Sequence, residues 1–229
     1  MEEKSYLAKE TLLWSKNFDN INLKITSETK KFNIKLGKEN IPHLLGLQYI
    51  NRYLKSQKGI ELYNEVIKND MSDEDIFKKV KKSHPKKDVV NVKNRIRTFK
   101  SFMENLENAR IVEQTNPKTH IKSKFLVIDT KDNFTMHLGV LETGNLDVFT
   151  DFEVERNIFE TYIVQNNDKF YKYTSIYEPI KSIEKYEENY QKWRKFSFNL
   201  EKDKELEEKF LIEEKEIIEE TELEEEMEI

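Results

Sequence analysis

The stretch that decides the fold is DVVNVKNRIRTFKSFMENLENA, residues 88–109. Apolar side chains recur in it at intervals of three and four residues, at Val89, Val92, Ile96, Phe99, Met103 and Leu106. This spacing places them on one face of a helix of about five turns, with Asp88 as its candidate cap. Beyond Pro117 the apolar period changes from helical to alternating. Helices followed by strands predict an α+β fold.

The segments after Pro117 predict an antiparallel sheet of four to five strands. Three strands are expected in KFLVIDT (124–130), NFTMHLGVLETG (133–144) and NLDVFTDFEV (145–154), joined by turns at TKDN and ETGN. IFETYIV (158–164) and KFYKYTSIYEPI (169–180) are expected to add one or two more. In the second strand, Met136 and Leu138 share one face while Thr135 and His137 share the other.

The rest of the chain is predicted to be mainly helical. Leu23–Leu36 alternates around the turn SETK and predicts a short β-hairpin, which is followed by helices in GIELYNEVIKN (59–69) and MSDEDIFKKVKK (71–82). SIEKYEENYQKWRKF (182–196) is again predicted to be helical. We therefore expect one domain over residues 1–200, with its core at about 23–177: a helical N-terminal half packed on the sheet. Residues 201–229 form an acidic tail, either a solvated helix or disordered.

Charge is unevenly distributed along the chain. Residues 201–229 hold 15 acidic residues and 4 lysines, a net of −11; because the whole chain is −5, the first 200 residues carry +6. A basic body suits a phosphate-bearing partner, but equally an ordinary lysine-rich surface. The chain has no cysteine, which excludes disulfides and cysteine-ligated zinc and favours a reducing compartment. Without a signal peptide or a long apolar run, the protein is expected in the cytoplasm of its bacterial host, away from the membrane.

Several enzyme classes lose support from the motifs. Five glycines provide neither a dinucleotide fingerprint nor a Walker A loop, and no GxSxG elbow occurs. The four histidines, His43, His84, His120 and His137, lack metal-ligand spacing, so no metal or other cofactor is expected. The remaining histidine, arginine, lysine, serine and threonine side chains suffice to cleave RNA, which carries its own 2′-hydroxyl nucleophile. Histidine can move the protons and the cations can stabilise the phosphate.

Three stretches, in order and spacing, resemble a known family. They are IPHLLGLQYI (41–50), the helical region 76–109 and the strand region 121–157. The diagnostic positions are His43 with Leu44 and Gly46, then the Lys82–Ser83 pair, and then Arg95. The chain resembles the fourth type of phage barnase-EndoU-colicin-RelE-like nucleases over roughly Leu23–Tyr177.

The resemblance implies a helical lead-in on a four-stranded antiparallel sheet and metal-independent ribonuclease activity. It implies that His43 acts as acid or base and that Arg95 and Lys82 stabilise the phosphate, with Ser83 beside them. Where the family pattern has a proline and a serine near the last strand, this chain reads DVFTDFE, so Thr150 would supply the hydroxyl. Candidate nucleic-acid contacts are Lys93, Arg97, Lys122 and His137.

Structural alternatives stand beside these assignments. His43 could equally fix the loop between hairpin and helix, and Lys82 and Ser83 could simply end a helix before Pro85. A competing function is a non-catalytic phage inhibitor that blocks a host defence complex, such as an anti-CRISPR protein. A third is a toxin whose nuclease activity is restrained by the acidic tail. RNA is the expected partner of the enzyme, a host protein complex that of the inhibitor, and the oligomeric state is open.

Overall fold

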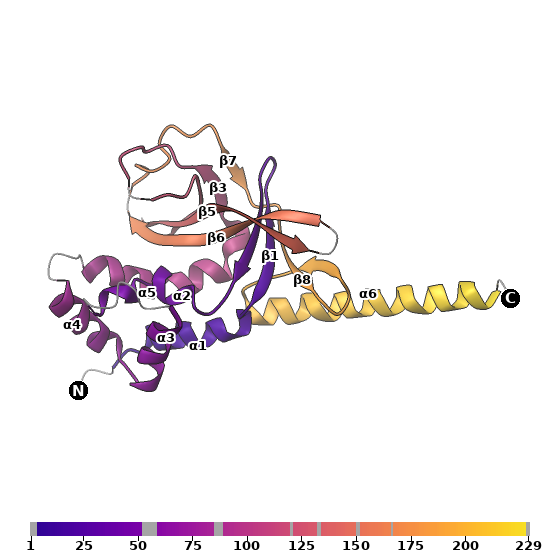
Figure 1. Cartoon of the computed structure of the whole chain (residues 1–229), viewed down its shortest axis with the longest axis horizontal. Coiled ribbons are helices and arrows are strands. Elements are labelled where there is room, and N and C mark those ends of the chain that lie inside the picture. The colour runs from indigo at the N-terminus through magenta and orange to yellow at the C-terminus, as the bar shows by residue number, and fades with distance from the viewer. Residues whose placement is uncertain are drawn as a thin grey trace.

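The computed structural model describes residues 4–51, 59–84, 89–119, 121–131, 134–149, 152–165 and 167–227. Within these ranges it gives the backbone, but not the side chains, of 145–149, 152–155 and 218–227. The helices gather on one side of a strongly curved sheet, and the last helix projects away from the body (Figure 1). The helices are α1 (Leu7–Trp14), α2 (Ile41–Leu44), α3 (Gly59–Lys68), α4 (Asp73–Ser83), α5 (Val89–Glu104) and α6 (Leu200–Met227), with 3₁₀ turns η1 (Ser15–Phe18), η2 (Leu47–Tyr49) and η4 (Leu106–Asn108).

The helical part of the prediction is confirmed for α3, α4 and α5. The capping box of α4 is present, since the Ser72 hydroxyl accepts from the Asp75 N–H at 3.3 Å and the Asp75 carboxylate accepts from the Ser72 N–H at 3.3 Å. The apolar stripe of α5 is buried at Val92, Ile96, Phe99 and Met103, and it continues to Leu106 in η4. Asp88, its expected cap, lies outside the described residues.

The sheet contains nine strands in the described part of the chain. They are β1 (Ile21–Thr26), β2 (Lys31–Leu36), β3 (Arg110–Glu113), β4 (Phe125–Lys131), β5 (Phe134–Phe149), β6 (Phe152–Gln165), β7 (Tyr177–Pro179), β8 (Ser182–Glu187) and β9 (Lys192–Lys195). Their spatial order is β7-β3-β4-β5-β6-β2-β1-β8-β9. The pairs are antiparallel except β2 with β6, which run parallel, so the sheet is mixed.

The expected four- to five-stranded antiparallel sheet is therefore wrong. The predicted hairpin, β1 and β2, does not stand apart, because β2 pairs with β6 at Asn33↔Arg156 and Ile34↔Asn157. The Asn157 side chain reinforces this junction by accepting from the Asn33 N–H at 3.0 Å. Short strands β3, β7, β8 and β9 then extend both ends of the sheet. The pairings of β2 with β6, β1 with β8 and β3 with β7 join segments far apart in sequence, which local periodicity does not report.

The segment 182–196 is a hairpin rather than the predicted helix. Ile183, Tyr186, Tyr190 and Trp193 have helical spacing, yet Tyr186 and Trp193 face each other across β8 and β9 with ring centroids 5.3 Å apart. Gln191 turns the chain with a φ of +51°. β8 forms backbone hydrogen bonds with the edge of β1, in the register Leu23↔Lys185 to Thr26↔Ser182, and this pairing favours strand over helix in the segment.

The predicted turn at ETGN is also wrong, because β5 continues through it. The ladder with β6 shifts register between Glu142 and Leu146, so these residues form a bulge within one long strand. Gly144 adopts a φ of +67° there, which glycine tolerates without a steric cost.

The two faces of the sheet carry unequal cores. The face toward α1–α5 holds the main cluster, which includes Met136, Leu138 and Tyr162. The opposite face holds a smaller cluster of Val112, Leu126, Ile128 and Phe170. The predicted alternation along β5 is confirmed, since Met136 and Leu138 enter the first core while His137 packs on Phe170 at 5.3 Å between ring centroids.

The acidic tail forms helix α6, and its first half is tied to the β8–β9 hairpin. Arg194 donates to Asp203 at 2.8 Å, Lys192 donates to Glu214 at 2.7 Å, and the Tyr190 and Phe210 rings lie 5.4 Å apart. Farther along, the helix leaves the body (Figure 1). Among the described residues, no helix has the length and apolar character that crossing a membrane requires.

Candidate active site

Helix α2 presents His43 to solvent because its other side chains are buried. Ile41, Pro42 and Leu44 all face the core, which leaves His43 as the exposed residue of this single turn. The protein around the imidazole still lowers its pKa below the ordinary value of 6.5 through partial desolvation. A neutral imidazole that remains accessible at pH 7 is suited to accept a proton from a substrate.

Gly46 ends this turn in a left-handed conformation. Its N–H donates to the His43 carbonyl at 3.0 Å, and its φ is +80°, a combination typical of a helix C-terminus. A side chain here would lie about 3.4 Å from Val92 and 3.7 Å from both Cδ and Nη1 of Arg95. These are ordinary van der Waals distances, so the positive φ, and not lack of space, is what favours glycine here, and the Arg95 guanidinium packs beside this backbone.

The guanidinium of Arg95 forms no ion pair with any residue that the structure describes. Its side chain is half-buried, and its Nε is shielded from solvent and lacks a hydrogen-bond partner among the described residues. Burial lowers the pKa of Arg95, while the Tyr49 and Tyr162 phenols raise it. Arginine keeps its proton in such surroundings, so the site holds a positive charge with no described carboxylate to neutralise it. A half-buried guanidinium without a carboxylate partner among the described residues is a candidate site for an external anion.

Tyr162 on β6 positions this part of α5. Its hydroxyl shares a hydrogen bond of 2.8 Å with the Thr98 hydroxyl, and its ring contacts Phe99 edge-on at 5.1 Å between centroids. Burial raises the pKa of Tyr162, and Arg95 opposes that shift. The phenol therefore stays neutral, so it fixes the helix against the sheet without cancelling the charge of Arg95.

The end of α4 reaches the same segment from another side. The Ser83 hydroxyl donates to the Ile50 carbonyl at 3.0 Å, and Nδ1 of His84 lies 2.9 Å from the Tyr49 carbonyl. Lys82 is exposed in the last turn of the helix. The structure thus brings the three predicted motif groups, at 43–46, 82–83 and 95, around one segment, residues 41–50.

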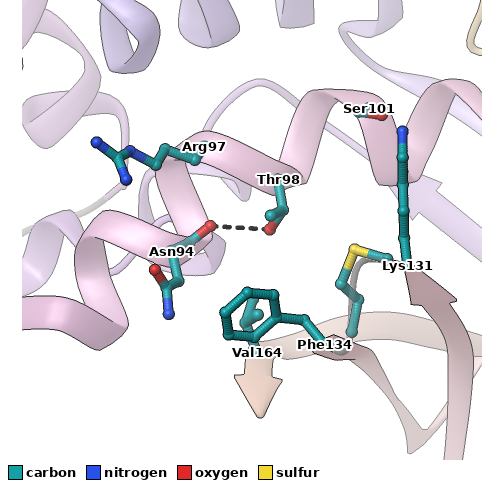
Figure 2. A pocket seen from close by; sticks show the side chains of 8 residues that line it. Asn94, Arg97, Thr98, Ser101, Lys131, Phe134 and Val164 are labelled. Carbon is teal, nitrogen blue, oxygen red and sulfur yellow. Dashed lines mark hydrogen bonds between the residues drawn. The ribbon is translucent and has the colours of Figure 1, made fainter. Parts of the chain in front are cut away.

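The remaining candidate cations lie in different surroundings. Lys93 extends over the Phe77 ring at 6.0 Å, between α4 and α5, and the backbone N–H of Lys122 is held by Glu160 at 3.1 Å. Arg97 lies on another face of α5, where it lines a pocket with Lys131 (Figure 2).

His137 lies in the core beyond the opposite face of the sheet. Its exposed fraction is 0%, and Phe170 and Tyr171 cover its ring at 5.3 and 5.7 Å between centroids. Burial lowers its pKa to about 4. This side chain therefore has no surface to offer a nucleic acid. Thr150, the candidate hydroxyl, lies outside the described residues.

Several residues of the site were not singled out from the sequence. Gln48 in η2 and Asn91 in α5 each bury a side-chain oxygen that has no partner among the described residues. Asn91 precedes Arg95 by one helical turn, a spacing that could have indicated a shared face. Nothing in the sequence around Tyr49 or Tyr162 indicates a role in the site, because only the folded chain brings their phenols near Arg95.

Comparison with known proteins agrees with the resemblance drawn from the sequence. The family described as phage-Barnase-EndoU-ColicinE5/D-RelE like nuclease 4 matches residues 9–215. No curated protein and no solved structure matched the chain. In the described part of the chain, no group of three or more histidine or acidic side chains is arranged to hold a metal ion.

Proposed function

Because the chain belongs to the phage-Barnase-EndoU-ColicinE5/D-RelE like nuclease 4 family, we propose that it cleaves RNA by attack of the 2′-hydroxyl on the adjacent phosphate. The observation that carries this proposal is the Arg95 guanidinium, which packs beside Gly46 and has no carboxylate partner within the described ranges. Gly46 lies three residues beyond His43. A guanidinium is a planar donor that matches two phosphate oxygens at once. Its positive charge would be compensated by the phosphate as negative charge develops there.

His43 is the group that moves a proton in this mechanism. As a base it takes the proton of the 2′-hydroxyl, whose oxygen forms a bond to phosphorus while the bond from phosphorus to the 5′ oxygen breaks. The departing 5′ oxygen takes a proton from water, and the protonated His43 returns its proton to solvent. The products are a 2′,3′-cyclic phosphate and a 5′-hydroxyl. The lowered pKa of the accessible His43 imidazole supports the base role, because in most molecules this side chain is neutral at pH 7.

Lys82 and Ser83 have supporting roles in this proposal. Lys82 is exposed at the end of α4, so it can approach a phosphate of the bound strand as a flexible point charge. The Ser83 hydroxyl is already committed to the Ile50 carbonyl, so its part is to hold α4 against the segment that carries His43.

The test is cleavage of an end-labelled structured RNA by the full chain, with EDTA present and absent. We expect EDTA-resistant cleavage with 2′,3′-cyclic phosphate ends, and none at a position where the RNA carries a 2′-deoxyribose. His43→Ala should lower the rate by about 10²–10⁴-fold, as expected for loss of proton transfer. Arg95→Lys keeps the charge but loses the planar fork, and should lower kcat more than it raises KM.

Lys100→Ala is the matched control, because Lys100 is an exposed cation on the same helix and pairs within it with Glu104 at 3.8 Å. All variants must keep the melting temperature of the parent within a few degrees for the comparison to count. Full activity of a folded His43→Ala variant would overturn the role of His43. Cleavage of the 2′-deoxy position would overturn the mechanism.

A second candidate, binding without catalysis, rests on helix α6. This acidic helix projects beyond the body and offers a long charged surface to a partner (Figure 1). Capture of a host defence complex that persists in His43→Ala but is lost on truncation after Leu200 would favour it. Loss of capture in both the His43→Ala variant and the truncated chain would not favour it.

A further inference from the structure

A second feature of α5 lies outside the His43–Arg95 site. A pocket of about 320 Å³ opens between this helix and the ends of β4, β5 and β6. We call it the α5 pocket. Figure 2 shows helix residues along one wall and strand residues along the other. Its lining consists of Asn94, Arg97, Thr98, Ser101, Lys131, Phe134, Met136 and Val164.

The α5 pocket combines an apolar base with cations that have no carboxylate partner. Met136 and Val164 are buried and Phe134 is half-buried, so they form the apolar part. Arg97 and Lys131 are exposed, and neither forms an ion pair or hydrogen bond within the described residues. The described lining contains no acidic side chain. An adjoining hollow of about 250 Å³ shares Lys131 with it and includes Asp129.

From this arrangement we infer that the α5 pocket binds one unpaired nucleotide, with its base against Phe134 and its phosphate at the end of the pocket where Arg97 lies. Lys131 stands at the other end and adds to the positive charge of the rim (Figure 2). Recognition of single-stranded RNA commonly stacks an unpaired base on an aromatic ring and pairs its phosphate with cations. Asn94 and Ser101 add amide and hydroxyl groups that can bond to base edges. The volume lies near the lower end of the range for small-molecule pockets, about 300–1,000 Å³, which suits a single nucleotide rather than a longer segment.

The α5 pocket is linked to the proposed active site through Thr98. Its hydroxyl lines the pocket and bonds to Tyr162, whose phenol interacts electrostatically with Arg95. The inference rests on the proposed function in one respect: with phosphate cleavage at Arg95, the pocket holds a neighbouring nucleotide of the same strand. Nucleotide binding itself does not require that cleavage occurs.

The experiment titrates the full chain with the four nucleoside 3′-monophosphates and with inorganic phosphate, followed by calorimetry and amide NMR. We expect a nucleotide to bind with a lower Kd than phosphate. Arg97→Ala should raise the nucleotide Kd about tenfold, as for a lost charged hydrogen bond. Lys131→Ala should raise it several-fold. Lys100→Ala removes a cation from the same helix outside the pocket and should leave the Kd unchanged.

The Phe134→Leu variant tests base stacking separately from phosphate binding, because leucine keeps apolar volume but has no aromatic ring. It should weaken nucleotide binding and leave phosphate binding unchanged. Equal Kd values for the parent and Arg97→Ala, or no saturable binding at millimolar nucleotide, would overturn the inference. Equal binding of nucleotide and phosphate would overturn the base subsite.

The same variants separate this inference from the cleavage reaction. If RNA is not cleaved but nucleotide binding depends on Arg97, the pocket stands and the catalytic proposal fails. If RNA is cleaved and Arg97→Ala changes neither Kd nor KM, the catalytic proposal stands and the pocket fails. If both stand, Arg97→Ala should raise KM with little change in kcat, because it removes binding away from the reacting phosphate.

Discussion

His137 makes a pH-dependent contribution to stability that can be worked from its burial. The ring is fully buried and its pKa is lowered to about 4, whereas an unfolded chain restores about 6.5. Between those values the unfolded chain binds the proton and the folded chain does not, so lowering the pH favours unfolding. A difference of about 2.5 pKa units corresponds to about 3 kcal/mol at pH 4 and to nothing above pH 7.

The assay is urea unfolding of the parent and of His137→Phe at several pH values from 7 to 4. The phenyl ring preserves packing on Phe170 and Tyr171 but has no proton to gain. Between pH 7 and pH 4 the parent should lose about 3 kcal/mol more of its free energy of unfolding than the variant. Parallel pH dependence in the two proteins would refute the reasoning, as would an NMR titration of His137 centred near 6.5. Weaker RNA binding by the variant without a change in pH slope would place His137 at the nucleic-acid interface instead.

Three further predictions concern stability. Arg194→Met should lower the free energy of unfolding by about 3 kcal/mol, because the buried guanidinium binds Glu187 at 2.6 Å and Asp203 at 2.8 Å. Denaturant unfolding measures this loss, and the control Lys202→Ala, at an exposed ion pair, should cost less than about 1 kcal/mol. Gly46→Ala should cost about 1–2 kcal/mol in the same assay, since its φ of +80° disfavours any side chain. Hydrogen bonds lower the pKa of Glu178 to about 2, so this carboxylate adds stability that is present above pH 4.5 and is lost as the pH falls toward 2. In Glu178→Gln the free energy of unfolding should therefore fall less steeply between pH 4.5 and 2 than in the parent, and an equal slope would contradict this prediction.

The elements that could be predicted are those whose signal is local. Helix α5 follows from its apolar stripe, and α4 from the Ser72–Asp75 capping box, because both depend on residues three or four apart. The number of strands in the sheet could not be predicted from such local patterns. Tyr186 and Trp193 show the limit, since the same aromatic spacing fits one helix face or a pair across a hairpin, and pairing with the distant β1 decides between them.

The candidate site divides along the same line. His43 and Arg95 could be named from short motifs, but their relation depends on the folded chain, which packs Arg95 of α5 beside the backbone at the left-handed Gly46. His137 shows why side-chain type is a weak guide to nucleic-acid binding. The residues that bury it are not visible locally, because Phe170 covers its ring from a distant loop. The Lys122 side chain is exposed, and its role in nucleic-acid binding stays a prediction.

The position of α6 bears on whether the acidic tail restrains the proposed active site. Arg194 and Lys192 hold its first half against the β8–β9 hairpin, and the remainder leads away from α4 and α5 (Figure 1). To bring the first half of α6 to Arg95 of its own chain, the protein would have to break the Arg194–Asp203 contact, whose arginine side chain is 1% exposed. Breaking a buried pair on one side typically costs about 3–5 kcal/mol, more than exposed acidic residues regain at a screened surface. We therefore predict that the first half of α6 does not restrain the site of its own chain, and that truncation after Leu200 leaves the rate of RNA cleavage unchanged in a chain that stays folded.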